Sequence, residues 1–115
     1  MTDPYLVHFR DPKNAFELED ADVVASAENP ACGDHGRLFL RVREDRIEHA
    51  SFLCRGCSAA IGTLSLLTEW LPGRRLSELD ALTLDDLADV VGPLPSAKKH
   101  ALRLAKDLLS RAAKA

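Results

Sequence analysis

The segment from Arg37 to Arg43 constrains the fold most, because its side chains alternate along the chain. Its leucines and valine fall on one face and its arginines on the other: Leu38, Leu40 and Val42 against Arg37, Arg41 and Arg43. This two-residue period is typical of a β-strand with one buried face. Residues 44–46 form a tight turn and residues 47–54 a partner strand. The pattern therefore predicts an antiparallel hairpin with one solvent-exposed face.

The period of the apolar residues changes after the hairpin. From Ile61 to Leu71 they recur at intervals of three and four, which predicts an amphipathic helix that ends at Pro72–Gly73. Residues 76–91 predict one or two further helical pieces, for which Thr83 is the expected N-cap. Ser96 is the expected cap of a last helix that runs to the C-terminus.

The region before the hairpin contains a short helix over residues 4–10, a strand over 22–27 and a loop over 29–36 that is dense in turn-forming residues. Strands therefore come first and helices follow. This order predicts an α+β domain with helices packed on one face of a sheet. The length of 115 residues is appropriate for one domain, 1–115.

Composition excludes several classes of protein. The formal net charge of −3 gives no reason to expect a nucleic-acid partner. No apolar run approaches the ~20 residues of a membrane helix, and residues 1–10 do not resemble a secretory signal. The three cysteines are an odd count in a chain with no export signal, so we expect reduced thiols and a cytoplasmic location.

Four residues suggest a metal site. Cys32 and Asp34 share one loop, in which Gly33 allows a tight turn. Cys57 lies where a strand ends and a helix begins, so the helix dipole favours its thiolate. We interpret Gly56, directly before it, as a conformational requirement: glycine permits a backbone conformation there that other residues resist. His100 lies near the start of the last helix and faces inward or toward a rim. Two thiols, a carboxylate and an imidazole are a ligand set for zinc or iron.

Each of these residues also has a simpler interpretation. The cysteines fit as buried apolar residues, Asp34 as part of an Asx turn, and His100 as a surface or capping residue. The same simple interpretation is given to His8, His35 and His49. Cys54 lies two residues after Phe52 and so shares its core-facing side of the strand, which favours burial. Cys54-x-x-Cys57 also has the spacing of a redox dithiol, but the alternating strand and helix units of thioredoxin-like proteins are absent.

Several motifs, taken together, resemble the IscU/NifU-type iron–sulfur cluster scaffold proteins across nearly the whole chain. They occur in the family's order: His8–Phe9 with Asp11–Asn14, Asn29-Pro30-Ala31-Cys32-Gly33-Asp34, Phe52 through Gly56-Cys57 to Ile61, Leu67–Trp70 with Gly73, and Leu94–Pro95 with Lys98 and His100. The resemblance implies a three-stranded antiparallel sheet with helices on one face. It also implies a transient [2Fe-2S] cluster, a cysteine desulfurase as sulfur donor and client or carrier proteins as recipients, with zinc often present in isolated protein. By position, Cys32, Asp34, Cys57 and His100 line that pocket.

Two departures from the family pattern bear on function. The family's third cysteine, a cluster ligand and often a sulfur acceptor, is replaced by Ala101. Cys54 is an alternative source of the missing thiol. The segment Leu94–Lys98 differs at two of five positions from the one that binds an Hsp70-type chaperone in many relatives, so that partnership stays open.

Three hypotheses follow. The first is a scaffold with an altered ligand set, the second a zinc-bearing sulfur acceptor that activates a desulfurase, and the third a relative that retains only protein contacts. None is an enzyme in the usual sense, because no nucleophile–base pair, phosphate loop or pair of catalytic acids is found. The sequence leaves open whether the ligands come from one chain or from two copies in a homo-oligomer.

Overall fold

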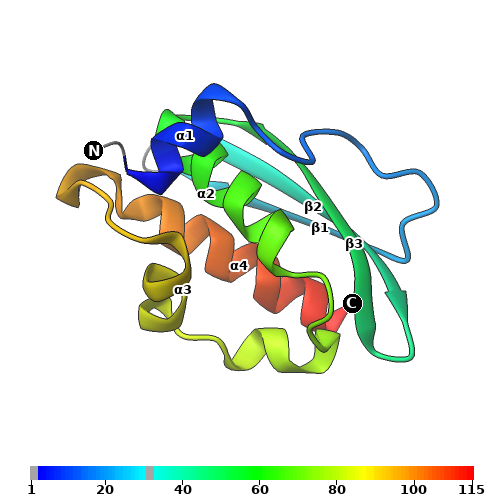
Figure 1. The fold of residues 1–115 in the computed structure, drawn as a ribbon. Coiled ribbons are helices and arrows are strands. Elements are labelled where there is room, and N and C mark those ends of the chain that lie inside the picture. Colours follow the sequence, from blue (N-terminus) through cyan, green and yellow to red (C-terminus); the bar gives the residue numbers. More distant parts are fainter. Residues whose placement is uncertain (1–2, 31–32) are drawn as a thin grey trace.

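The computed structural model describes residues 3–30 and 33–115. Three antiparallel strands form one sheet in the order β1-β2-β3, with β1 at Val23–Asn29, β2 at Asp34–Arg43 and β3 at Arg46–Arg55 (Figure 1). Glu44 and Asp45 join β2 to β3 with positive φ angles of 51° and 65°, as tight hairpin turns require. The predicted α+β class and the three-stranded sheet are confirmed.

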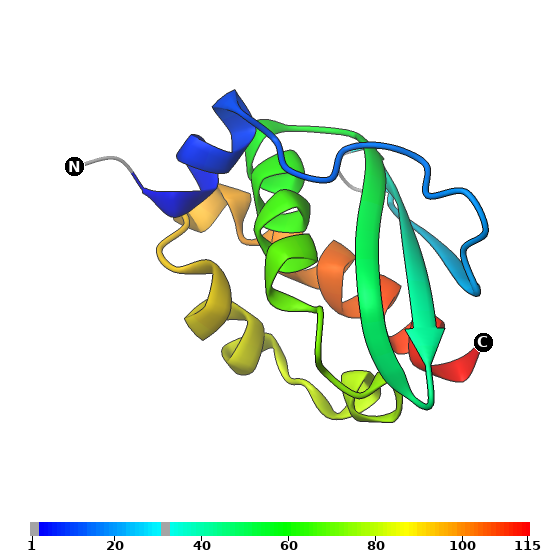
Figure 2. The same cartoon turned by 45° about the vertical axis from the view of Figure 1, so that its right-hand side comes forward.

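The helices follow the predicted order. They are α1 (Pro4–Arg10), α2 (Ser58–Trp70), α3 (Leu84–Val91) and α4 (His100–Lys114), with short 3-10 helices at Leu76–Ala81 and Ser96–Lys98. Helix α2 packs on β3, and α4 packs on β1 and β2. Figure 2 shows α2, α3 and α4 together on one side of the sheet. The helices therefore cover one sheet face, as predicted.

The strand register builds the core between the sheet and the helices. Ala25 lies opposite Leu38, which lies opposite Phe52, and all three side chains are buried. Leu104 and Leu108 of α4 are fully buried in the same cluster. The alternation that predicted β2 thus reflects burial against α4.

The other sheet face is only partly exposed to solvent. Arg41 and Arg37 are half-buried there, and the Arg37 guanidinium lies 4.9 Å from the centre of the Phe39 ring. Phe39 itself is 1% exposed and Ser51 is fully buried. The predicted solvent-exposed face is therefore interrupted at its centre.

Helix α1 packs closely on α2. A Cβ atom at Gly62 would overlap the backbone carbonyl of Tyr5. The segment after α1 then lies beside β3, where the Phe52 amide donates to the Asn14 carbonyl at 2.9 Å. Glycine at position 62 therefore allows the close approach of the two helices.

Two local predictions are wrong. The loop expected over 29–36 is shorter, because Asn29 pairs with Asp34 and extends both strands. Ser96 does not cap α4: it begins a 3-10 turn, and Lys99 is the N-cap residue without a side-chain cap bond. In contrast, Thr83 caps α3 in a capping box with Asp86, as expected for its position.

Candidate metal centre

Three elements place potential ligands at one end of the sheet. Asp34 is the first residue of β2, Cys57 lies between β3 and α2 as the N-cap of α2, and His100 is the first residue of α4. All three positions are element boundaries, so each side chain is anchored by regular structure on one side. The strand-to-helix junction predicted at Cys57 is confirmed.

The three side chains contact one another. The Cys57 Sγ lies 3.4 Å from the His100 Nε2 and 3.8 Å from the Asp34 Oδ2. The His100 Nε2 lies 3.2 Å from the same carboxylate oxygen. One sulfur, one nitrogen and one oxygen atom thus lie within 4.8 Å of one another.

Asp34 is the most deeply buried member, with a side chain that is 3% exposed. A carboxylate at that depth needs hydrogen-bond donors. The Cys57 amide donates to its Oδ1 at 3.2 Å. Asp34 therefore fixes the start of α2 and touches both other side chains.

Gly56 allows Asp34 to reach this position. A Cβ atom at residue 56 would lie 2.6 Å from the Asp34 Oδ1 and 2.9 Å from its Cγ. The backbone of Gly56 does not have a positive φ, unlike that of Gly33, whose φ is 72°. The interpretation of Gly56 as a conformational requirement is thus wrong: its missing side chain makes room for a carboxylate.

A thiolate, an imidazole and a carboxylate at this spacing can hold a borderline metal ion such as zinc or iron. The site combines the predicted Asp34, Cys57 and His100, whereas Cys32 lies outside the described residues. Within residues 3–30 and 33–115, no other group of three potential ligands is found. The assignment of the four residues as ligands stays a prediction.

Cys54 is not among these three side chains, and its role as a further ligand stays a prediction. It is half-buried and packs against the hydrophobic core, in line with its predicted position on the Phe52 side of β3. Burial, with a smaller contribution from the negative charge of Asp34, raises the pKa of the Cys54 thiol to about 12. In the absence of a metal ion, burial therefore favours the neutral thiol of Cys54.

Ala101 follows His100 directly in α4. It is 1% exposed and packs with Tyr5 and Ala59 in a small cluster between α1, α2 and α4. His100, one residue earlier, faces the site. The chain thus has an apolar contact between helices at position 101.

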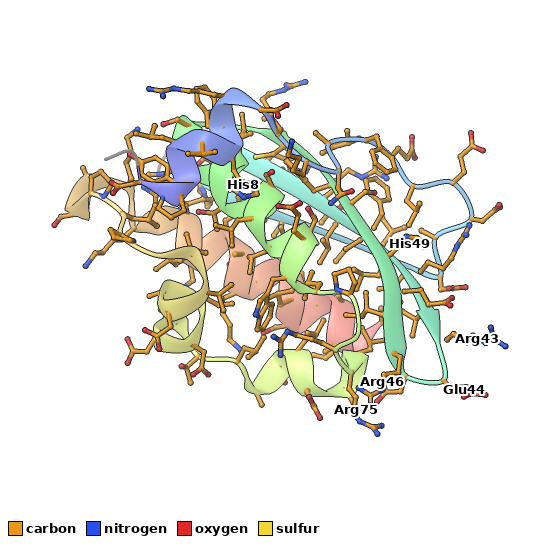
Figure 3. All side chains as sticks on the ribbon, in the orientation of Figure 1. His8, Arg43, Glu44, Arg46, His49 and Arg75 are labelled. Carbon is orange, nitrogen blue, oxygen red and sulfur yellow. The ribbon has the colours of Figure 1, made fainter. Side chains whose placement is uncertain are left out.

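The other histidines lie outside the group. His8 Nδ1 is 2.8 Å from the Ser65 hydroxyl, and His35 Nε2 is 3.9 Å from Glu28. His49 is exposed on β3, and Figure 3 shows it and His8 well apart.

In the described ranges, no helix is long and apolar enough to cross a membrane.

The fold and site together define a small α+β domain with a Cys/His/Asp cluster at one end of an antiparallel sheet. Residues 1–115 match the NifU-like N-terminal domain family, and the chain belongs to that family.

Similar proteins support this assignment. The chain is 40% identical over 111 residues to the "Iron-sulfur cluster assembly scaffold protein IscU 1" of Archaeoglobus fulgidus, covering 96% of this chain and 72% of that protein. It is 37% identical over 115 residues to the IscU scaffold protein of Azotobacter vinelandii, covering 96% and 89%.

A solved NifU-like N-terminal protein from Brucella abortus has the same fold. Its TM-score is 0.68 at 18% identity, over 98% of this chain and 88% of that one.

Proposed function

We propose that this protein is an iron–sulfur cluster assembly scaffold, for which iron and sulfide are cargo. The observation that carries the proposal is the contact between the Cys57 Sγ and His100 Nε2 at 3.4 Å, with the Asp34 carboxylate against both. The relatives that cover most of the chain are named as such scaffolds. We propose Cys32 as the fourth ligand.

This ligand set suits a transient cargo. Two thiolates, one carboxylate and one imidazole replace the all-thiolate set that holds clusters firmly. A [2Fe-2S] cluster held in this way is expected to be labile, as handing it to client or carrier proteins requires. A cysteine desulfurase would supply the sulfur, and the reduced thiols suit a cytoplasmic location.

Anaerobic reconstitution with ferrous iron and sulfide, followed by visible absorption, tests the proposal. Cys57→Ser and His100→Ala should each lower the amount of bound cluster or speed its loss. The matched controls are Cys54→Ser, a thiol that packs against the core, and His49→Ala, an exposed imidazole; both should load like wild type. Wild-type protein that takes up no cluster but binds zinc firmly would refute the scaffold role.

A second candidate is a zinc-bearing sulfur acceptor that activates a desulfurase. The buried Ala101 favours it, because the family's third thiol is missing and zinc can be held by the remaining nitrogen, oxygen and sulfur atoms. Zinc would keep the thiols as thiolates until the partner arrives. This candidate predicts one added sulfur atom on a cysteine after incubation with a desulfurase and free cysteine. Mass spectrometry that finds no added sulfur on any of the three cysteines would refute it.

The missing thiol also fits a third candidate, a relative that keeps only protein contacts. The contacts among Asp34, Cys57 and His100 count against it, because a protein without metal chemistry has no need to bring these three side chains together. Wild-type protein that loads no cluster, binds no zinc and accepts no sulfur from a desulfurase would favour this third candidate over both others.

A further inference from the structure

Four basic residues lie close along the chain to the candidate ligands, and one of them, Arg55, lines the same surface hollow as Asp34. Arg55 lies two residues before Cys57, and Lys98 and Lys99 directly precede His100. Arg103 lies one helical turn after Lys99 on the exposed side of α4. Because Cys57 contacts His100, the two segments that carry these four residues meet at the site, and we call the four residues the basic rim.

The basic rim has no partner within the fold. Among the described residues, no ion pair or side-chain hydrogen bond involves any of its four members, and three of them are exposed, with Lys98 half-buried. The cations in the second half of α4 behave differently. Lys106 donates to the Asp80 carbonyl at 2.7 Å, Lys114 lies 3.9 Å from the Asp80 carboxylate, and Arg111 donates to the Ser26 carbonyl.

The basic residues in the first and second halves of α4 therefore have different roles. The later cations fasten α4 to β1 and to the segment before α3. The side chains of the earlier ones make no ion pair or hydrogen bond with the part of the chain that the structure describes, and like charges repel one another at short range. Positive charges that have no partner within the fold can attract and orient a negatively charged partner that approaches the site.

The surroundings of the basic rim limit what that partner can be. The neighbouring helix α3 exposes Asp85, Asp86 and Asp89, and Asp89 lines the same surface hollow as Lys99. The whole chain carries a net charge of −3. A long polyanion such as nucleic acid would extend from the rim onto these acidic residues and be repelled, whereas a protein with a compact acidic patch need not reach them.

We infer that the basic rim docks an acidic protein that exchanges iron–sulfur cargo with the site. The inference rests on the proposed scaffold function, because only then must a protein come within bonding distance of Cys57 and His100. Opposite charges on the two surfaces would speed encounter and orient the two sites toward each other. Binding should therefore weaken as salt is added.

The test measures binding of the metal-free full chain to an acidic [2Fe-2S] ferredoxin in its apo form, in about 0.1 M salt, where the Debye length is about 10 Å. Charge reversal by Lys99→Glu or Arg103→Glu removes one attraction and adds one repulsion, so each should weaken binding roughly 3- to 10-fold. The matched control is Arg43→Glu, which makes the same change in charge. Arg43 is exposed at the far end of β2, about 30 Å from Asp34 by strand length.

Figure 3 shows Arg43 at the tip of the hairpin, pointing away from the rest of the protein. The control should therefore bind within about twofold of wild type, since charges more than a Debye length away are screened. Wild-type affinity should also fall steeply as the salt concentration is raised.

Three results would overturn the inference: no binding of the ferredoxin by wild type, equal effects of Arg103→Glu and Arg43→Glu, or preferential binding of a short DNA duplex through the same residues. Reconstitution of each variant is measured separately. If wild type binds the ferredoxin through the rim but loads no cluster, the scaffold function fails while the docking surface stands. If it loads cluster but Arg103→Glu binds normally, the docking surface fails alone.

Discussion

Gly56→Ala tests how the candidate site is built. The new methyl group would lie 2.6 Å from the Asp34 Oδ1, well inside normal contact distance, so the carboxylate must move. The movement would break the bond that the Cys57 amide donates to this oxygen at 3.2 Å. A hydrogen bond to a charged group contributes about 1.5–3 kcal/mol, and the loss of glycine's freedom in the unfolded chain returns about 0.4–1 kcal/mol. The free energy of unfolding should therefore fall by about 1–2 kcal/mol.

Urea unfolding of the metal-free, reduced protein, followed by circular dichroism, measures this change. The decisive comparison repeats Gly56→Ala in an Asp34→Ala background, where the carboxylate is gone and only its Cβ, 3.2 Å away, remains close. There the substitution should cost less than about 0.5 kcal/mol, which is a coupling of about 1 kcal/mol between the two positions. An equal cost in both backgrounds would show that Gly56 is not needed to accommodate Asp34.

Three further changes have defined outcomes in the same unfolding assay. Gly62→Ala should cost roughly 1–3 kcal/mol, because the added methyl meets the rigid backbone of Tyr5, whereas Ser58→Ala, at a half-buried position in the same helix, should cost much less. Burial raises the pKa of Cys54 to about 12 from an ordinary 9.0. As the pH rises, the unfolded chain therefore loses this proton first, and the free energy of unfolding should fall between pH 9 and 12. In Cys54→Ala this fall should be smaller. Thr83→Ala should cost about 1 kcal/mol by removing the cap of α3, and no loss would contradict the capping box.

The elements that could be predicted from the sequence are those with a local cause. The alternation around Leu38 and the three-and-four spacing around Leu67 follow from burial of one face, so both elements have the predicted type. The cap at Thr83 and the junction at Cys57 are also local, since each depends on a few neighbouring residues. The resemblance to a known family supplied the strand count.

The incorrect predictions concern contacts between distant segments. Asn29 and Asp34 look like loop residues, but pairing between the strands that contain them extends the sheet. Nothing near Gly56 in the sequence indicates a carboxylate from residue 34 beneath it. Ser96 is a good cap by type, yet a 3-10 turn intervenes and α4 starts later. Residue type alone therefore suggested which residues form the site, but not how Asp34 is held in it.

The candidate ligands come from the first strand of a hairpin, the following helix and the last helix, so Asp34 and Cys57 are 23 positions apart and Cys57 and His100 are 43 positions apart. No short stretch of the unfolded chain contains the complete group. A metal ion or cluster that binds this group binds the native state, and by mass action it adds about 2.7 kcal/mol of stability at a free concentration about 100 times its dissociation constant. Loading should therefore make the protein harder to unfold, and a partner that loosens α4 from the sheet would weaken the hold on the cargo.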